Sequence, residues 1–478
     1  MVSSPLFVLT MKFSGLKFFL IIYFLLLVLY SIFSYSLTAP NLVLTSWQPY
    51  WQFQTWMWEV FFNDRQLLAY TFTALMLGLF FVYTLILRSL KKEARSTKHE
   101  ERNKFQNFRF KIFKYCFEFR YSSFEIKALL VYFLITVPLL FSNNALSYDV
   151  FNYMFNAKVV MQYGGNPHTS VPLNYSQDEW LRFMHNTHTV APYGYGWTAL
   201  SLIPYSLGLG KFLPTWVIFR LFSYLSIFLL YFSLKFLAKN LNLKLTTWNL
   251  GLLFLNPLFL IEIISNSHND LFMLVPAVVS LALVINPKTE SLKPKQIFKK
   301  KQEIIKLRLS ALLLAFSVSI KLATVVLIPI WLILVLSLFK FKISSLFRVS
   351  DLGFRIFENN FILFSSIFLF LPLITERSKQ FLPWYLLWSL VWIPLLAAKK
   401  RHSGRDPESG VKARKLWVSL LLIFSLTSML RYIPYLWFGD YAGQVDLYQK
   451  LITWSAIPVW IAYVTIKAYV AKNRTIIG

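Results

Sequence analysis

The chain has 478 residues, of which 56% are hydrophobic, 18% aromatic and only 15% charged. Soluble domains average about 25% charged residues, so this composition excludes an ordinary soluble enzyme and predicts an integral membrane protein. The net charge of +28 does not indicate nucleic-acid binding, because the basic residues gather in a few loops between apolar blocks. Cys116 is the only cysteine, which excludes an intramolecular disulfide and a cysteine-rich zinc site.

Lysine and arginine are concentrated in three loops, residues 89–125, 287–308 and 399–414, whereas the long stretch 143–213 holds only three basic residues. Cytoplasmic loops of membrane proteins are enriched in these residues, so the three basic loops are predicted inside and residues 143–213 outside. The whole chain, residues 1–478, is expected to form a single integral membrane domain in the cell membrane.

Apolar blocks follow one another along the chain and predict an all-α polytopic protein with about twelve transmembrane helices and both termini in the cytoplasm. The predicted spans are residues 14–36, the block before Arg88, and residues 126–142, 214–237, 247–265, 270–286, 306–338 as a pair, 360–375, 381–397, 415–431 and 452–471. The first is expected to be a retained helix, because no small-residue cleavage site follows it. The block 306–338 is too long for one span and is expected to be a hairpin broken near Lys321. The short block 196–210 is expected to lie in the outer interface.

The predicted outer loop is rich in aromatic residues and Asn, and Gly and Pro punctuate it. A loop of this length is functional or disordered, and its aromatic content argues against disorder. Its motifs are Ser147-Tyr-Asp149-Val-Phe-Asn-Tyr153, Gly165-Asn-Pro167-His and Ala191-Pro-Tyr193-Gly-Tyr-Gly-Trp197. We therefore expect the functional site on the outer face.

Asp149 follows the third predicted span by seven residues, where an outer helix would begin. At the water–lipid boundary its carboxylate is placed to take a proton from a hydroxyl group, as a general base. The alternative is an N-cap that binds the first free amides of that helix, and Ser147 is another candidate for the cap. The sequence leaves both interpretations open.

Four of the six histidines fall in predicted outer loops. His185 and His188 have the spacing of metal ligands on one helix face. Because no Cys or paired carboxylate accompanies them, hydrogen bonding within the loop is the alternative that we favour. The motif His268-Asn269-Asp270 ends the fifth predicted span on the outer face. Asp270 either caps the next helix or borders the same cavity as Asp149.

Three basic residues fall on the predicted outer surface against the general charge bias: Lys321, Arg377 and Arg431. Each needs an anionic partner, which is either a phosphate or an internal carboxylate. The alternative is that each side chain extends to ordinary lipid headgroups.

Residues 147–197 resemble the first extracytoplasmic loop of GT-C-fold glycosyltransferases, which are multi-span enzymes that take a sugar from a polyprenyl-phosphate carrier. The segment from Asn256-Pro257 to His268-Asn-Asp270 is similar to the second outer loop of that family. Phe316-Ser-Val-Ser-Ile-Lys321 is similar to its Lys-bearing hairpin, and Pro383-Trp-Tyr385 to a late donor-side motif. The resemblance runs in consistent order over residues 126–400, and the nearest subgroup uses polyprenyl-phosphate mannose.

The resemblance implies a GT-C-like helix bundle in which Asp149 is the catalytic base of an inverting transfer of a hexose, mannose by the nearest subgroup, to a lipid-linked or glycan acceptor. It also implies that Lys321 and Arg377 hold the carrier phosphate. The residues expected to bind substrate are Asn152, Tyr153, Asn166, His185, His188, Tyr193, Trp197, His268, Asn269, Asp270 and Tyr385. No cofactor and no metal site are expected, although the His-Asn-Asp element leaves the need for a divalent cation open. Membrane lipids are the remaining expected partners.

Two other classes compete with the enzyme. A transporter or flippase for lipid-linked glycans would show repeat symmetry and binding groups at mid-membrane, and we find no repeat. A glycan polymerase or ligase would also have a large outer loop, and Arg182 with His185 keeps that hypothesis open.

Overall fold

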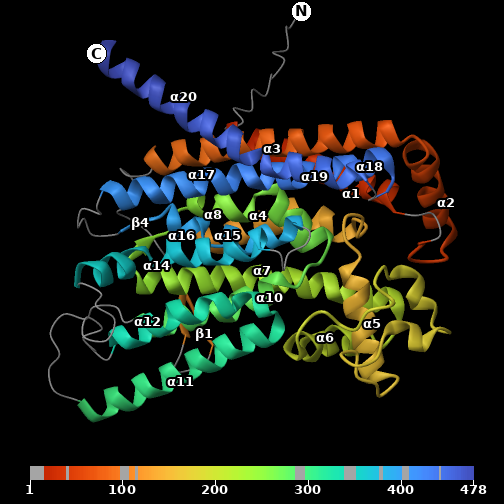
Figure 1. Cartoon of the computed structure of the whole chain (residues 1–478), viewed down its shortest axis with the longest axis horizontal. Helices are drawn as coiled ribbons and strands as arrows, with labels where there is room; N and C mark the ends of the chain where they lie inside the picture. Colours follow the sequence, from red (N-terminus) through yellow and green to blue (C-terminus); the bar gives the residue numbers. More distant parts are fainter. Residues whose placement is uncertain are drawn as a thin grey trace, which may run out of the picture.

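The structure is a computed structural model that describes residues 15–38, 42–96, 107–112, 117–285, 296–338, 351–375, 381–400, 408–440 and 443–477. Figure 1 shows long helices lying side by side in a bundle, with the shorter helices α5 and α6 at one end and strand β4 toward the other. The first half of the chain forms α1 (Gly15–Phe33), α2 (Gln48–Met57), α3 (Arg65–Ser96), α4 (Ser123–Thr136), α5 (Asp149–Met161), α6 (Tyr195–Leu207), α7 (Phe212–Asn240), α8 (Thr247–Phe254) and α9 (Pro257–Leu260).

The second half is also helical. It forms α10 (Asp270–Val284), α11 (Gln296–Ile320), α12 (Ile328–Leu338), α14 (Asp351–Phe370), α15 (Leu387–Leu390), α16 (Ile393–Leu396), α17 (Glu408–Leu430), α18 (Ile433–Phe438), α19 (Gln444–Trp454) and α20 (Ala456–Ile477). Two short antiparallel strand pairs accompany the helices, β1 (Asn107–Ile112) with β2 (Phe117–Ser122) and β3 (Leu243–Lys244) with β4 (Lys399–Lys400).

Within the part of the chain that the structure describes, five helical stretches are long and apolar enough to cross a membrane: Gly15–Leu37, Arg65–Glu93, Phe212–Asn240, Gly410–Phe438 and Gln444–Val470. A sixth crossing is formed if the pair Thr247–Phe254 and Pro257–Ser265, bent by 58°, counts as one span. They agree with five of the predicted spans, or with six if the bent pair is one span. The total of twelve and the positions of the termini stay predictions.

Proline explains why several other predicted spans are short or interrupted. α4 ends where Pro138 opens a 3₁₀ turn, and the segment 381–397 is divided at Pro383 and Pro394. Because proline has no amide proton and its ring clashes with the preceding turn, it ends or bends a helix. The predicted break in the block 306–338 is confirmed: α11 ends at Ile320 and Lys321 is extended before the next turn.

The predicted interfacial block 196–210 forms α6, which packs between α5, α7 and α11. Its outer face stays apolar and exposed at Ile203, Leu207 and the following Leu209. A short helix with an exposed apolar face is suited to lie in a membrane interface.

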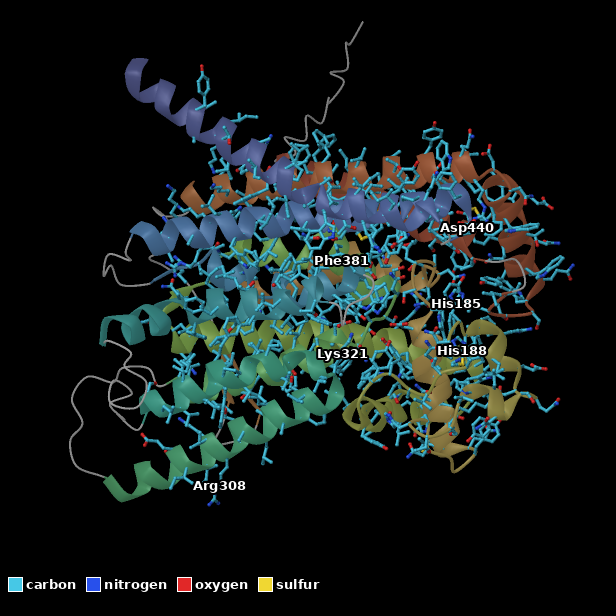
Figure 2. All side chains as sticks on the ribbon, viewed as in Figure 1. His185, His188, Arg308, Lys321, Phe381 and Asp440 are labelled. Atoms are coloured by element: carbon cyan, nitrogen blue, oxygen red, sulfur yellow. The ribbon has the colours of Figure 1, made fainter. Side chains whose placement is uncertain are left out.

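The predicted sidedness has a direct test. Figure 2 places His185, His188 and Asp440 toward one end of the bundle and Arg308 toward the other. In a Cys116→Ala background, single cysteines at positions 170 and 440 should react with a membrane-impermeant thiol reagent added outside cells. Cysteines at positions 100, 295 and 405 should react only after permeabilisation, because basic loops are retained in the cytoplasm. Labelling of position 295 from outside would reverse the assigned side of the second outer loop.

Candidate active site

The segment that leads into α5 is fixed from inside the bundle by a buried arginine. Arg220 on α7 is 1% exposed and donates to the carbonyl of Leu139 at 2.9 Å, to Oδ1 of Asn144 at 2.7 Å and to the carbonyl of Ser265 at 2.8 Å. Asn144 in turn donates to the same Ser265 carbonyl at 2.9 Å. Buried polar groups need such partners, so Arg220 holds the segment before Asp149 against the turn that precedes His268.

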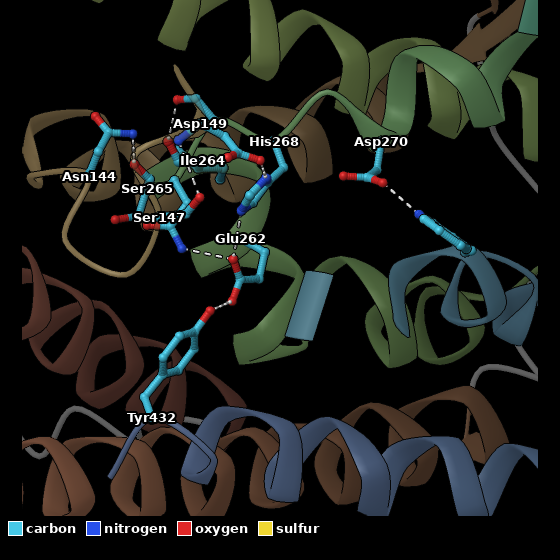
Figure 3. A network of polar contacts seen from close by, with 12 residues as sticks. Asn144, Ser147, Asp149, Glu262, Ile264, Ser265, His268, Asp270 and Tyr432 are labelled. Carbon is cyan, nitrogen blue, oxygen red and sulfur yellow. Dashed lines mark hydrogen bonds and ion pairs between the residues drawn. The ribbon is translucent and has the colours of Figure 1, made fainter. Parts of the chain in front are cut away.

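Asp149 is the first residue of α5, and the N-cap residue Tyr148 makes no side-chain capping bond. The carboxylate of Asp149 instead faces other side chains. The Tyr193 hydroxyl donates to Oδ2 at 2.6 Å, and Nδ1 of His268 lies 3.5 Å from the same atom (Figure 3). The side chain is 17% exposed. Burial opposes its ionisation, but the close positive charge of His268 and the hydrogen bond from the Tyr193 hydroxyl outweigh burial and hold the pKa of the Asp149 carboxyl below its ordinary value.

His268 is fully buried between two carboxylates. Its Nε2 lies 3.3 Å from Oε2 of Glu262 while its Nδ1 faces Asp149, and its ring stacks on Trp384 with centroids 4.0 Å apart. Burial alone would lower the pKa of His268, but the two carboxylates raise it to about 9. Both distances are longer than a good N–H···O bond. The contacts are therefore chiefly between an imidazolium and two anions.

A further ionic contact, between Lys321 and Asp270, lies near the contacts of His268. Nζ of Lys321 lies 2.8 Å from Oδ1 of Asp270, and the indole of Trp388 donates to the same oxygen at 2.5 Å. The ammonium is surrounded by aromatic rings, with Tyr193, Tyr385 and Trp388 centroids at 5.6, 5.1 and 5.3 Å. Ring faces attract cations. Lys321 is thus held by one carboxylate and three rings.

Two glycines bring the outer loop onto the hairpin that carries Lys321. The amide of Gly194 donates to the carbonyl of Ile320 at 3.0 Å. A Cβ on Gly194 would overlap the Ser319 carbonyl oxygen, and one on Gly196 would overlap the Ser319 hydroxyl. Only glycine permits this approach. Tyr193, which binds Asp149, is consequently fixed one residue from a backbone contact with the Lys321 hairpin.

Several residues that are expected to bind substrate are polar and buried near the carboxylates of Asp149 and Asp270. Some of their polar atoms have no partner among the described residues: Asn152 Oδ1, Tyr153 Oη, Trp197 Nε1, Asp270 Oδ2 and both amide atoms of Asn269. Each of these side chains is at least nine-tenths buried. Such groups are costly when unpaired and are suited to bind a polar ligand.

The other expected residues lie apart from this cluster. Asn166 is exposed and folds its own turn by accepting the amide of His168 at 3.0 Å. His185 stacks on Tyr148 with ring centroids 4.0 Å apart, and both His185 and His188 are exposed. Arg377 lies outside the described residues. Within the described ranges, no three His, Cys, Asp or Glu side chains are placed together to hold a metal.

Sequence reasoning missed Glu262, Trp384, Trp388 and Tyr432 as members of the site. For Glu262 a signal existed, because an acidic residue within an apolar span is a functional candidate by default. Trp384 lies within the motif Pro383-Trp-Tyr385 but was not selected from it. Trp388 and Tyr432 had no such signal, since aromatic residues are common throughout this chain.

Comparisons with known proteins identify the family of the chain. No curated protein and no solved structure matches the chain. A family model described as alpha-(1->6)-mannopyranosyltransferase, N-terminal domain, of the MptA_B family, matches residues 42–337, which include Asp149, His268 and Lys321. The chain therefore belongs to this family of GT-C mannosyltransferases and is a glycosyltransferase.

Proposed function

We propose that this mannosyltransferase takes mannose from a polyprenyl-phosphate carrier and joins it to a lipid-linked or glycan acceptor on the extracytoplasmic face, with Asp149 as the base. The observation that carries the proposal is the position of Asp149: a partly exposed carboxylate at the start of α5, oriented by Tyr193 and His268. A base held in this way is ready to accept a proton without reorganising.

The proposed step needs one proton transfer. The acceptor hydroxyl oxygen attacks C1 of mannose as its proton passes to Asp149, and the bond from C1 to the phosphate oxygen breaks on the opposite face. The phosphodiester donor becomes a phosphate monoester. This leaving group is stable as an anion, so no general acid is required.

Lys321 is proposed to bind the carrier phosphate while it stays paired with Asp270. An ammonium has three protons, and the contact with Asp270 uses one. The other protons are available for phosphate oxygens, and charge-assisted hydrogen bonds of this kind stabilise the charge that develops on the leaving group. Arg377 is proposed as the second phosphate ligand.

The anomeric configuration of the donor follows from the linkage that the family forms. A family that forms alpha-(1->6) bonds by an inverting attack requires a beta-linked donor and a primary hydroxyl on the acceptor. The purified protein should therefore transfer radiolabelled mannose from beta-linked polyprenyl phosphate to an alpha-(1->6) mannoside, and the product should be degraded by an alpha-mannosidase.

Transfer from a nucleotide sugar but not from the lipid donor would contradict the proposed donor. Equal use of the alpha-linked lipid donor would contradict inversion. The matched control is the Asp149→Asn protein in the same detergent.

A further inference from the structure

Glu262 is an acidic residue buried within an apolar, bent membrane segment. It lies in the π-helical turn Ile261–Ser265 that follows α9, and its side chain is fully buried. An ionised carboxylate in such a position is costly unless it is paired and hydrogen-bonded. The carboxylate of Glu262 therefore needs charged or hydrogen-bonding partners in the interior, and these partners indicate its role.

The contacts of Glu262 divide into two kinds, as Figure 3 shows. Two neutral donors fix the carboxylate: the Tyr432 hydroxyl donates to Oε1 at 3.0 Å and the Asn266 amide to Oε2 at 2.8 Å. The remaining contact is with a charge, because Nε2 of His268 lies 3.3 Å from Oε2. The opposite nitrogen of that ring faces Asp149.

These contacts form one line of side chains from Tyr432 through Glu262 and His268 to Asp149. The order of the groups is donor, anion, cation, anion, so each neighbour stabilises the next. We propose that Glu262 is a positioning residue for mannosyl transfer: it keeps the His268 ring charged and directed at Asp149. The proposal rests on the proposed role of Asp149 as the base.

The groups around His268 support this assignment. Asp149 faces the ring from α5, Glu262 from the π-helical turn, and the neutral ring of Trp384 covers one face. Lys321 is the other cation whose charge reaches Asp149, and its contact is with Asp270. Glu262 is accordingly the anion that balances His268 on the side away from Asp149.

The test is Glu262→Gln, which keeps the size of the side chain and its acceptor oxygen for Tyr432 but removes the charge. The glutamine amide would then donate to Nε2 of His268 and leave the ring neutral. In ¹⁵N-histidine-labelled protein at pH 7.5, the His268 signal, assigned with His268→Gln, should show two protonated nitrogens in the wild type and one in the variant.

Kinetics give a second measurement. Single-turnover transfer by Glu262→Gln should fall about 10-fold or more, with donor binding unchanged, because the base is less well oriented. The acid limb of its pH–rate profile should move to higher pH, because a neutral ring no longer favours ionisation of Asp149. A merely structural role would not move that limb. Tyr432→Phe, which leaves the charge of Glu262 in place, should keep His268 charged.

Glu179→Gln is the matched control, because it makes the same chemical change at an exposed position of the outer loop. A neutral His268 ring in the wild type would overturn the proposal even if Glu262→Gln failed to fold. A Glu262→Gln protein that transfers mannose at the normal rate, with the acid limb of its pH–rate profile unchanged, would also overturn the proposal. Failure of the proposed function has a different signature: full activity of Asp149→Asn while the His268 ring stays charged.

Discussion

Asp149→Asn should fold normally and bind the lipid donor, yet transfer mannose about 100-fold more slowly or worse. Asparagine keeps the size of the side chain and can still accept the hydrogen bond from Tyr193, but it cannot take a proton at neutral pH. It also removes one of the two anions beside His268. The measurement is single-turnover transfer alongside thermal unfolding in detergent.

The chain supplies a matched control for a capping role. Asp64 accepts the amide of Leu67 at 2.9 Å, as a capping aspartate does, so Asp64→Asn reports what this substitution costs at a helix cap. That cost should be about 1 kcal/mol or less, because asparagine caps a helix nearly as well as aspartate. Asp149→Glu should keep a little activity, because the base survives but is displaced by one methylene group. A folded Asp149→Asn protein with normal turnover would remove Asp149 from the mechanism and make Asp270 the next candidate.

The second large effect is expected at Lys321. Replacing it with methionine removes the proposed phosphate ligand and also leaves Asp270 as an unpaired buried anion, so both stability and donor use should fall. Loss of one charge-assisted contact corresponds to about 10- to 150-fold weaker donor use. Breaking a buried ion pair from one side typically costs about 3–5 kcal/mol of stability, and the partial exposure of Lys321 places this pair toward the lower end of that range.

A double variant separates the two effects. In Lys321→Met with Asp270→Asn, no charge is left unpaired, so thermal stability should recover while donor use stays low. Lys321→Arg should rescue donor use in part, because charge is kept and geometry changes. Arg377→Ala should weaken donor use without a loss of stability of the same size. If the double variant recovered normal donor kinetics, Lys321 would be a structural partner of Asp270 and the proposed phosphate site would be wrong.

The sequence predicted much of the helical architecture because lipid imposes long apolar blocks that are visible without a structure. It also located the break at Lys321, since a charged residue interrupts an otherwise apolar stretch. It did not anticipate the bend between α8 and α9, because Asn256 and Pro257 alone do not distinguish a kinked span from a turn. Proline-divided segments such as 381–397 likewise give no reliable count of crossings.

For the site, the sequence named Asp149, Tyr193 and His268 but not how they meet. Each was selected for its own chemistry or for its place in a motif, whereas a pair such as Lys321 and Asp270 depends on how α10 and α11 pack. The sequence left either a phosphate or an internal carboxylate as the partner of Lys321, and in the structure the carboxylate of Asp270 lies 2.8 Å away. Glu262 and Tyr432 are 170 residues apart, and no local pattern connects them.

The contact of Gly194 and Gly196 with the end of α11 has a consequence for how the enzyme handles acceptors of different length. The residues next to Tyr193 and Lys321 are joined by this backbone contact, so the two backbone segments hold one spacing. The distance between the proposed base, Asp149, and the proposed phosphate ligand, Lys321, would then be a property of the fold and not of the acceptor that is bound. Longer acceptors would change how often a productive complex forms, and the rate of bond exchange within that complex would stay the same from one chain length to the next.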